Sequence, residues 1–370
     1  MAPAIPLSPF PPPPSLTFAK TADGRMQSAL NAAIGRLSAA PSFRIAIIDL
    51  DGSADLRWAA HDGNIMDYIA SEPKIIALYA AMALRDMARR FHIARPLIRA
   101  AATLGARVMG QKPPPEPRLF DQLRQEMNPA ILAAGDSRLA TTRPHERVPN
   151  YEAVLHPPRT GMPDFTRTYR DALRAMIVPS SNPGAGTCIR GVGYSYMSGA
   201  MKEALLFRNG IGPWLAGDYV GQYTYARIDS KNDDGVAQAG TALSMAKLMA
   251  IIMKRGVAFM HGDAYTDMHT LLEAAAQTGP DTPFVTRAED FPAAHRSIVF
   301  PRKVVTHSKL GFGPLKKKNG GVNVGSEVSR IEGLEKSGKA YIMAYQNLDW
   351  RYNDASDIAF VARETLKAYE

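Results

Sequence analysis

The stretch MDYIASEPKIIALYAA, residues 66–81, decides how the rest of the chain is interpreted. It places Ser71 and Lys74 at the start of an apolar helix, where side chains three residues apart share one face, about 60° apart. Pro73 is tolerated only in the first turn of a helix, so it puts Ser71 at the N-terminal edge. Backbone N–H groups favour a developing negative charge there, and a part-buried lysine nearby is a usable base. Taken alone, the pattern is more typical of an N-capping serine followed by a solvated lysine.

The composition is that of a globular protein with a basic surface. The chain has 370 residues, 46% hydrophobic and 21% charged, which suits one large or two intimate domains. Its net charge of +9 is compatible with anionic partners: a cell-wall polymer, an acidic substrate, a membrane surface or nucleic acid. The one dense run, Lys316–Lys318 before Asn319-Gly320-Gly321, is typical of a solvated hairpin tip. No nucleic-acid-binding motif with interleaved aromatics is present, so no nucleic-acid partner is expected.

Three further features bound the class of protein. The single cysteine, Cys188, excludes an intrachain disulfide. No apolar run reaches the roughly 18 residues of a membrane span, so no transmembrane segment is expected. Residues 1–24 are predicted to be a proline-rich flexible arm; they lack the basic and apolar regions of a signal peptide. The arm fits a tether exposed after signal removal as well as the natural start of a cytoplasmic protein.

The order of predicted elements defines the fold class. Apolar spacing predicts helices over residues 26–37, 71–90, 166–178, 199–207, 242–254, 265–277 and 355–369. Strands are predicted over residues 43–50, 56–60, 297–305, 309–314, 322–331 and 339–346. Asp51-Gly52-Ser53 is a hairpin signal between the first two strands, and Thr241 or a neighbour is expected to cap the helix over 242–254.

We therefore predict an α+β fold, an α/β sandwich. An antiparallel sheet is built from N- and C-terminal segments with flanking helices, and an all-helical region is inserted. The predicted subdomains are 25–65 with 236–370 for the sheet and 66–235 for the helices. A catalytic cleft is expected between the two.

Two later motifs change the interpretation of Ser71. Ser180-Ser181-Asn182 is predicted to form a turn directly after an apolar helix, and Lys309-Leu310-Gly311-Phe312-Gly313 lies on a strand near the C-terminus. In this order the three motifs resemble those of the penicillin-recognising serine enzymes: the serine β-lactamases, D,D-peptidases and related esterases and amidases. Those motifs are Ser-x-x-Lys, Ser-x-Asn or Tyr-x-Asn, and Lys-Thr-Gly or variants. The resemblance covers residues 43–369 and implies a β-lactamase/transpeptidase-like fold and a periplasmic or extracytoplasmic location.

The resemblance also implies a role for each catalytic residue. Ser71 is the expected nucleophile, activated by unprotonated Lys74. Ser180 is the expected proton relay across the cleft, and Asn182 is expected to hold the lysine or a substrate amide. Lys309 supplies positive charge and favours the neutral amine of Lys74.

The strand motif is expected to bind substrate through Leu310, Gly311 and Phe312. By resemblance, the backbone N–H groups of Ser71 and Phe312 form the oxyanion hole. The sequence departs from the family at Leu310, where a threonine or serine hydroxyl usually helps to bind a substrate carboxylate. Recognition of a penicillin-type carboxylate is therefore not expected.

A second departure concerns deacylation. No Glu-x-x-Leu-Asn segment, which carries the deacylating glutamate of class A β-lactamases, occurs between Asn182 and Thr241. The long loop over residues 217–234 offers only the acids Asp218, Asp229, Asp233 and Asp234. β-Lactamase activity is therefore expected to be weak or absent, and a peptidase, amidase, esterase or acyltransferase fits better.

Other candidate sites are weaker. His261, Asp263, Asp267 and His269 lack a recognised metal-ligand spacing and are interpreted as scattered surface residues, so no metal and no cofactor is expected. Cys188 is interpreted as a small core residue. The aromatic residues of the long loop and its surroundings either line the cleft mouth or pack in the loop: Trp214, Tyr219, Tyr223 and Tyr225. His307 either touches the site or lies on the opposite strand face.

The sequence supports two hypotheses from different classes. The first is a serine hydrolase or acyltransferase that cleaves an amide or ester of a small molecule or peptide through an acyl-enzyme on Ser71. The second is a non-catalytic ligand-binding protein on the same fold, which the two departures favour.

Overall fold

The computed structural model describes residues 7–51, 55–112, 115–139, 143–158, 161–220, 226–278, 283–315, 323–333, 338–349 and 354–370. The predicted turn residues Gly52 and Ser53 and the lysine run Lys316–Lys318 lie outside these residues, as do Tyr223 and Tyr225. None of the helices in the described ranges is both long and apolar enough to cross a membrane.

One five-stranded antiparallel sheet joins the two ends of the chain. Its strands, in sheet order, are β10 (Val305–Pro314), β11 (Asn323–Glu332), β12 (Ala340–Asp349), β2 (Arg44–Asp49) and β4 (Trp58–His61). The C-terminal strand β12 pairs antiparallel with the N-terminal β2, Ala344 opposite Ala46. This order leaves β10 at the sheet edge.

The sheet is buried on both faces because its strands alternate between two cores. Ile45 and Ile47 of β2 belong to one hydrophobic cluster, whereas Ala46 and Ile48 belong to the other. Successive side chains of a strand point to opposite faces, so a strand that is apolar at every position must be covered on both sides.

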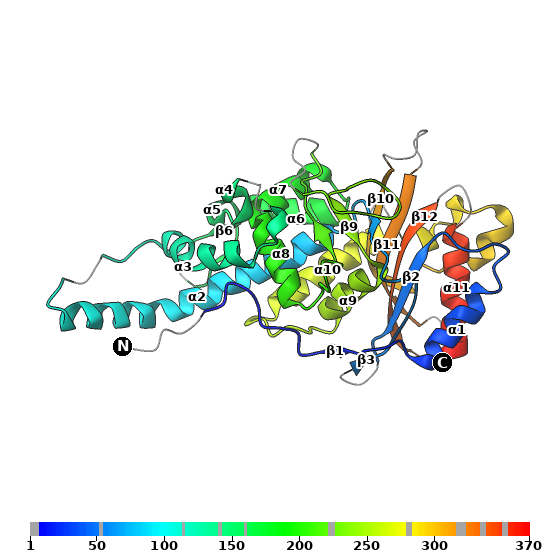
Figure 1. The fold of residues 1–370 in the computed structure, drawn as a ribbon, viewed down its shortest axis with the longest axis horizontal. Coiled ribbons are helices and arrows are strands. Elements are labelled where there is room, and N and C mark those ends of the chain that lie inside the picture. The colour runs from blue at the N-terminus through cyan, green and yellow to red at the C-terminus, as the bar shows by residue number, and fades with distance from the viewer. Residues whose placement is uncertain are drawn as a thin grey trace.

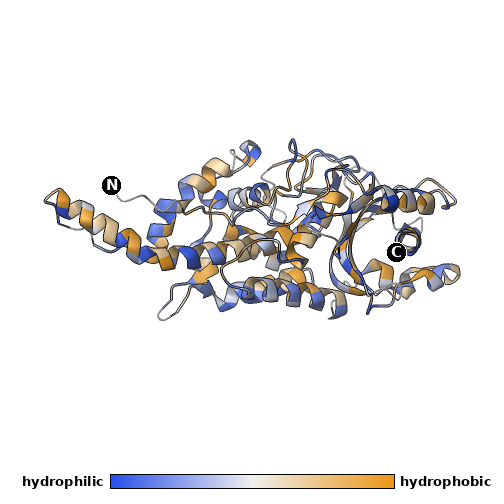
Figure 2. Ribbon diagram, turned by 90° about the horizontal axis from the view of Figure 1, so that it is seen from below, coloured by the Kyte–Doolittle hydropathy of each residue, from blue (hydrophilic) through white to orange (hydrophobic). Residues whose placement is uncertain are grey.

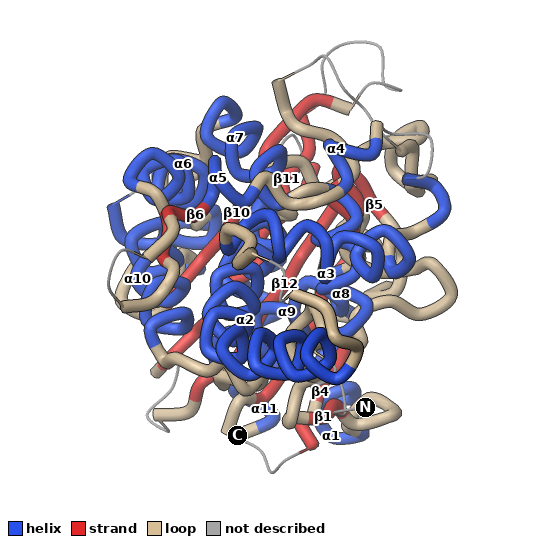
Figure 3. The backbone as a smooth tube through the Cα atoms, turned by 90° about the vertical axis from the view of Figure 1, so that its left-hand side faces the viewer, coloured by secondary structure: helices blue, strands red, loops and turns tan. Residues whose placement is uncertain are grey.

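Helices supply that cover (Figure 1). α1 and α11 pack together on the outer face of the sheet, and α9 packs on the inner face against β2, β11 and β12. Figure 3 shows the sheet strands running behind the inner helices. The helices are α1 (Gly24–Ile34), α2 (Lys74–Val108), α3 (Leu119–Ala134), α4 (Pro144–Arg147), α5 (Tyr151–Val154), α6 (Arg167–Ile177), α7 (Asn182–Val192), α8 (Tyr194–Glu203), α9 (Ala242–Met253), α10 (Asp263–Thr278) and α11 (Asp354–Tyr369).

Short strands tie the helical region to the sheet side. β5, which precedes Ser71, pairs with β9, and β9 pairs with β8. The short strands are β1 (Thr17–Phe18), β3 (Asp55–Leu56), β5 (Asp67–Tyr68), β6 (Leu155–His156), β7 (Asp164–Phe165), β8 (Trp214–Leu215) and β9 (Gln238–Gly240).

The structure confirms the predicted α+β class and differs from the sequence predictions in three elements. The helix after Ser71 begins at Lys74 with Pro73 as its N-cap and runs on to Val108. A helix, α7, begins where a turn was predicted, because Ser181 caps it and Pro183 sits in its first turn. The strand predicted over 297–305 is absent: Ala293–Ile298 forms a 3₁₀ helix and β10 starts at Val305.

The N-terminal arm also differs from its prediction. Where it is described, it packs on the body instead of hanging free. Phe10 is buried against Tyr196, with ring centroids 5.3 Å apart, and occupies the space beside Gly199. β1 then pairs in parallel with β3. Pro9 and Pro11 are buried together with Phe10, so the segment contributes apolar burial of its own.

Candidate active site

Ser71 lies in a strained turn directly before α2. Ala70 has a φ of 46°, a left-handed conformation that is uncommon for a residue with a side chain. Two long-range hydrogen bonds hold this turn: Tyr219 Oη donates to the carbonyl of Ala70 at 2.8 Å, and Ser326 Oγ donates to that of Ile69 at 2.9 Å. Strain of this kind persists where the surroundings over-determine the backbone, as they do in catalytic sites.

Lys74, the first residue of α2, is fully buried and points at the second motif. Its Nζ donates to Asn182 Oδ1 at 2.9 Å, to Ser180 Oγ at 3.3 Å and to the Ser180 carbonyl. The same Nζ lies 4.6 Å from the centre of the Tyr219 ring, within reach of a cation–π contact. The structure therefore brings together the first two motifs, which are more than 100 residues apart in the sequence.

The second motif is shaped by the start of α7. Ser181 caps the helix by accepting from Gly184 N at 3.2 Å, and Asn182 is its first residue. Ser180 just before the cap has a φ of 56°, so it too is left-handed. This local backbone turns the side chains of Ser180 and Asn182 toward the amine of Lys74.

The third motif reaches the same point from β10. Lys309 is nearly fully buried, and its Nζ donates to Ser180 Oγ at 2.8 Å and to the Leu310 carbonyl at 2.8 Å. The hydroxyl of Ser180 thus lies between two lysine amines. A hydroxyl can accept and donate hydrogen bonds, so this arrangement can pass a proton between the lysines.

Two glycines let β10 lie directly against the turn of Ser71. A Cβ at Gly311 would lie 2.2 Å from the carbonyl oxygen of Ile69 and 2.7 Å from the backbone nitrogen of Glu72. A Cβ at Gly313 would lie 2.7 Å from Tyr68 Oη. Only glycine fits the close backbone approach at Gly311, whereas the neighbour at Gly313 is the end of the Tyr68 side chain.

The neighbouring side chains of β10 point to the outer face. Leu310 is buried in the core formed with α1 and α11, so it contributes its backbone carbonyl to the site and keeps its side chain out of it. Phe312 is 45% exposed and packs edge-on against Phe284, with ring centroids 6.2 Å apart.

A buried carboxyl group next to Ser71 is a feature that sequence reasoning missed. Glu72 is fully buried, and burial raises the pKa of its carboxyl well above the ordinary value; Glu327 raises it further, while Ser326 and Lys309 oppose the shift. The single hydroxyl proton of Ser326 goes to Ile69, so it does not satisfy the Glu72 carboxylate. Burial of this carboxyl without a partner favours its neutral form.

Glu327 is a second buried carboxyl group near Lys309. Burial raises its pKa, while hydrogen bonds from Tyr345 and Ser308 and the charge of Lys309 lower it. Its oxygens accept from Ser308 Oγ at 2.7 Å and from the backbone of Phe284 at 3.2 Å. The Glu327 carboxyl on β11 therefore links the side chain of Ser308 on β10 to the backbone of Phe284.

A polar cavity of about 390 Å³ opens beside this constellation. Asp218 in its wall is almost fully buried and ion-paired to Arg190 at 2.8 Å. The cavity is lined by Tyr68, Asn182, Gly217, Asp218, Tyr219, Arg227, Asp233, Asp234, Gly235, Val236, Ala237, Gln238 and Pro314. The sequence left open whether Tyr219 lines the cleft or packs in the loop. Tyr219 does both, because its ring faces Lys74 and its hydroxyl donates a hydrogen bond to the carbonyl of Ala70.

The other sequence candidates lie elsewhere. Asp263 and Asp267 are ion-paired to Arg85 and Arg89 of α2, with Arg89 Nη1 2.7 Å from Asp263 Oδ2. No group of three or more metal-ligating side chains gathers within the described ranges. Cys188 is buried, and burial raises the pKa of its thiol.

His307 packs against α10. Its ring lies 5.4 Å from that of His269 on α10. Burial, with Arg330 and His269, lowers its pKa to about 4. It is therefore a neutral residue at neutral pH that packs against α10, on the same face of β10 as Lys309, which is not the opposite-face placement that the sequence left open.

Comparisons with known proteins agree on the fold. No protein-family description matches the sequence, and no curated protein matches it. A solved structure of the TLA-1 extended-spectrum β-lactamase matches with a TM-score of 0.50 and 11% identity, over 94% of this chain and 99% of that one. A β-lactamase from Chitinophaga pinensis and a class A β-lactamase from Bacteroides cellulosilyticus each match at 12% identity and a TM-score of 0.48, over 92% and 94% of this chain and 97% and 98% of theirs.

The chain has the fold of the penicillin-recognising serine enzymes, as the sequence resemblance predicted. Its α+β architecture, with a sheet built from both ends and an inserted helical region, is that of a serine β-lactamase. At this identity the likeness concerns the fold; the chemistry of the site rests on the residues described above.

Proposed function

We propose that the protein is a serine hydrolase or acyltransferase that cleaves an amide or ester bond through an acyl-enzyme on Ser71. The observation that carries the proposal is the Ser180 hydroxyl, held 3.3 Å from Lys74 Nζ and 2.8 Å from Lys309 Nζ beside the turn of Ser71. A buried lysine next to a second cation favours its neutral amine, which can accept a proton from a serine hydroxyl.

In the proposed reaction, each proton that leaves a reacting group is taken up by Lys74 or Ser180 and is later returned. Ser71 Oγ attacks the substrate carbonyl and its proton passes to Lys74. The oxyanion accepts hydrogen bonds from the N–H groups of Ser71 and Phe312, each typically contributing about 10²–10³ in rate. The bond to the leaving group breaks, and Lys74 returns the proton to that group through the Ser180 hydroxyl.

Deacylation repeats these steps with water or an acceptor nucleophile as the attacking group. The incoming group loses a proton through Ser180 to Lys74, the ester bond to Ser71 breaks, and the proton returns to Ser71 Oγ. Asn182, which accepts from Lys74 Nζ at 2.9 Å, keeps the amine in place through both halves.

Two contacts support a substrate other than a β-lactam. Leu310 lies in the outer core, so the strand presents no side-chain hydroxyl for a substrate carboxylate at this position. Asp218 is ion-paired with Arg190 and almost fully buried, which leaves it poorly suited to activate a deacylating water. The proposed substrate is therefore a peptide or small-molecule amide or ester, with weak or no β-lactamase activity.

Active-site labelling tests the proposal. A fluorophosphonate or a labelled penicillin should attach to the wild-type protein, and Ser71→Ala should lose the label. Ser28→Ala, an exposed serine on α1, is the matched control and should label as the wild type does. No labelling by either probe, with the protein folded, would contradict the proposal.

The alternative is a ligand-binding protein on the same fold. The ion pair of Asp218 and the buried Leu310 favour it, because both remove groups that a β-lactamase uses. It predicts that a ligand is bound unchanged and that Ser71→Ala keeps its affinity.

A further inference from the structure

The C-terminal half of α2 protrudes from the body of the molecule (Figure 1). Five of the eleven large apolar side chains that are exposed in the described part of the chain belong to its end: Ile93, Leu97, Leu104, Val108 and Met109. Figure 2 shows the hydrophobic colouring along this projecting end. Such a concentration is unusual for a soluble surface and marks an interaction site.

The side chains on this segment are sorted into rows. Residues four apart lie above one another on a helix, so Leu104 and Val108 form one row and Ile93 and Leu97 an adjacent one. Leu97, Leu104 and Val108 are each more than 60% exposed. The two rows make a continuous apolar stripe about 25 Å long, from the helical rise over 17 residues.

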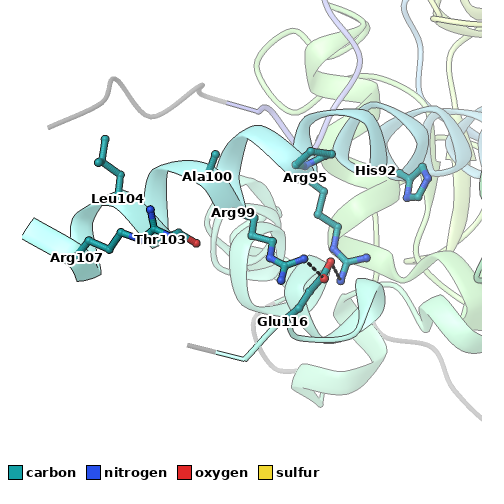
Figure 4. A pocket seen from close by; sticks show the side chains of 9 residues that line it. His92, Arg95, Arg99, Ala100, Thr103, Leu104, Arg107 and Glu116 are labelled. Carbon is teal, nitrogen blue, oxygen red and sulfur yellow. Dashed lines mark hydrogen bonds and ion pairs between the residues drawn. The ribbon is translucent and has the colours of Figure 1, made fainter. Parts of the chain in front are cut away.

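A basic row lies on the same segment; Arg107 is next to the stripe around the helix, whereas Arg95 and Arg99 lie on the far side. Arg95, Arg99 and Arg107 lie four and eight residues apart, and Figure 4 shows their side chains around a cavity of about 570 Å³ on α2. Glu116 is the acid in this cavity, and it holds Arg99 at 2.6 Å and Arg95 at 3.2 Å. From Met87 to Pro115 the sequence has no aspartate or glutamate.

We infer that this end of α2 docks on an anionic phospholipid membrane, lying in the plane of the interface. The apolar stripe enters the acyl boundary, and Arg107, with exposed Lys112, reaches the headgroup phosphates. Charge complementarity selects this occupant. A second copy would bring Arg107 and Lys112 of both chains to one apolar interface, and the nearby acid, Glu116, already pairs with Arg95 and Arg99, so this is unfavourable.

Membrane docking also sets the position of the proposed active site. Lys74 lies 19 residues before Ile93, where the docked segment begins, so along the helix the cleft would stand roughly 30 Å from the near end of that segment. The docking inference does not depend on the chemistry of Ser71.

Vesicle flotation of the full-length protein tests the inference. The wild type should float with phosphatidylcholine vesicles that contain phosphatidylglycerol, and should stay in solution with pure phosphatidylcholine or at high salt. Arg107→Gln with Lys112→Gln should weaken binding about 25-fold, since each basic residue near an anionic surface contributes about fivefold. The matched control, Arg302→Gln with Lys303→Gln, removes two exposed charges from outside α2. It should bind the vesicles much more tightly than the Arg107→Gln, Lys112→Gln variant does.

The apolar stripe has its own variants. Leu97→Ser with Leu104→Ser should weaken flotation at least tenfold, whereas Leu205→Ser, an equally exposed leucine on the body, should leave it unchanged. Circular dichroism should show all variants folded, because the replaced side chains are exposed. Equal flotation of the stripe variant and the wild type would overturn the inference. So would a wild type that does not float but forms a dimer that the stripe variant loses, because a second copy would then cover the stripe.

Discussion

At the residue scale, the site depends on polar groups buried where their charged forms are disfavoured. Asp67, four residues before Ser71, shows this clearly. Burial raises the pKa of its carboxyl to about 6, partly opposed by Arg44, whose Nε lies 3.6 Å from Asp67 Oδ2. The sequence could not show this, because an aspartate at the start of a short strand is normally expected at the surface.

The raised pKa of Asp67 predicts a pH-dependent stability. The folded protein holds the proton more tightly than the unfolded chain, so the contribution of Asp67 is greatest below pH 3.8 and is lost as the pH rises to about 6. A shift of this size corresponds to about 3 kcal/mol. Urea unfolding at several pH values should therefore show that Asp67→Asn gains stability relative to the wild type as the pH rises from 3.8 to about 6. A constant difference would contradict the assignment.

His307 provides a control of opposite sign. Its pKa of about 4 lies below the unfolded value of 6.5, so its contribution is present above pH 6.5 and lost as the pH falls toward 4. His307→Gln should thus gain stability relative to the wild type on acidification, where Asp67→Asn loses its advantage.

At the element scale, the sequence predicted most regular elements, and it failed where distant contacts decide. The helix α9 is capped by Thr241 through a reciprocal capping box with Ser244, as its sequence suggested. The start of α7 was missed because Ser181-Asn182-Pro183 resembles a turn as much as a helix N-terminus. The hydrogen bond from Tyr219 to the carbonyl of Ala70 was missed because it joins residues 149 positions apart.

The contact between β10 and the Ser71 turn predicts the effect of one substitution. Gly311→Ala would place a Cβ 2.2 Å from the Ile69 carbonyl oxygen, a backbone atom that cannot swing away. We expect a loss of about 1–3 kcal/mol in unfolding free energy and at least a tenfold slower labelling of Ser71. Urea unfolding and a labelling time course measure both.

Gly105→Ala is the matched control. A Cβ there meets nothing within 4 Å, and the residue lies inside α2, so we expect a gain of about 0.5–1 kcal/mol. Equal stability of the two alanine variants would show that β10 does not press on the turn as described.

At the scale of the whole molecule, the site lies where three distant segments meet: the turn before α2, the start of α7 and the edge strand β10. The ordered motifs predicted this meeting, since the fold that they imply brings them together. The division into subdomains 25–65 with 236–370 and 66–235 stays a prediction. The sequence did not reveal that the arm packs on the body, because its proline-rich composition gave no sign of the residues that bury Phe10.

The packing of the arm predicts a cost for its removal. Phe10 is 4% exposed and lies against Tyr196 and Gly199, so Phe10→Ala should lower the unfolding free energy by about 3–5 kcal/mol. Urea unfolding checks this directly. A change within about 0.5 kcal/mol, as for an exposed side chain, would mean that the arm is free in solution.

The central claim, an acyl-enzyme on Ser71, is tested most directly by intact-mass spectrometry. The wild type and Ser71→Ala are each exposed to a β-lactam, a D-amino-acid amide and a simple ester. The account predicts a mass increase equal to the acyl group on the wild type with at least one donor, mapped to the peptide that holds Ser71, and none on Ser71→Ala. An unmodified wild type with every donor, or an adduct that persists in Ser71→Ala, would contradict it.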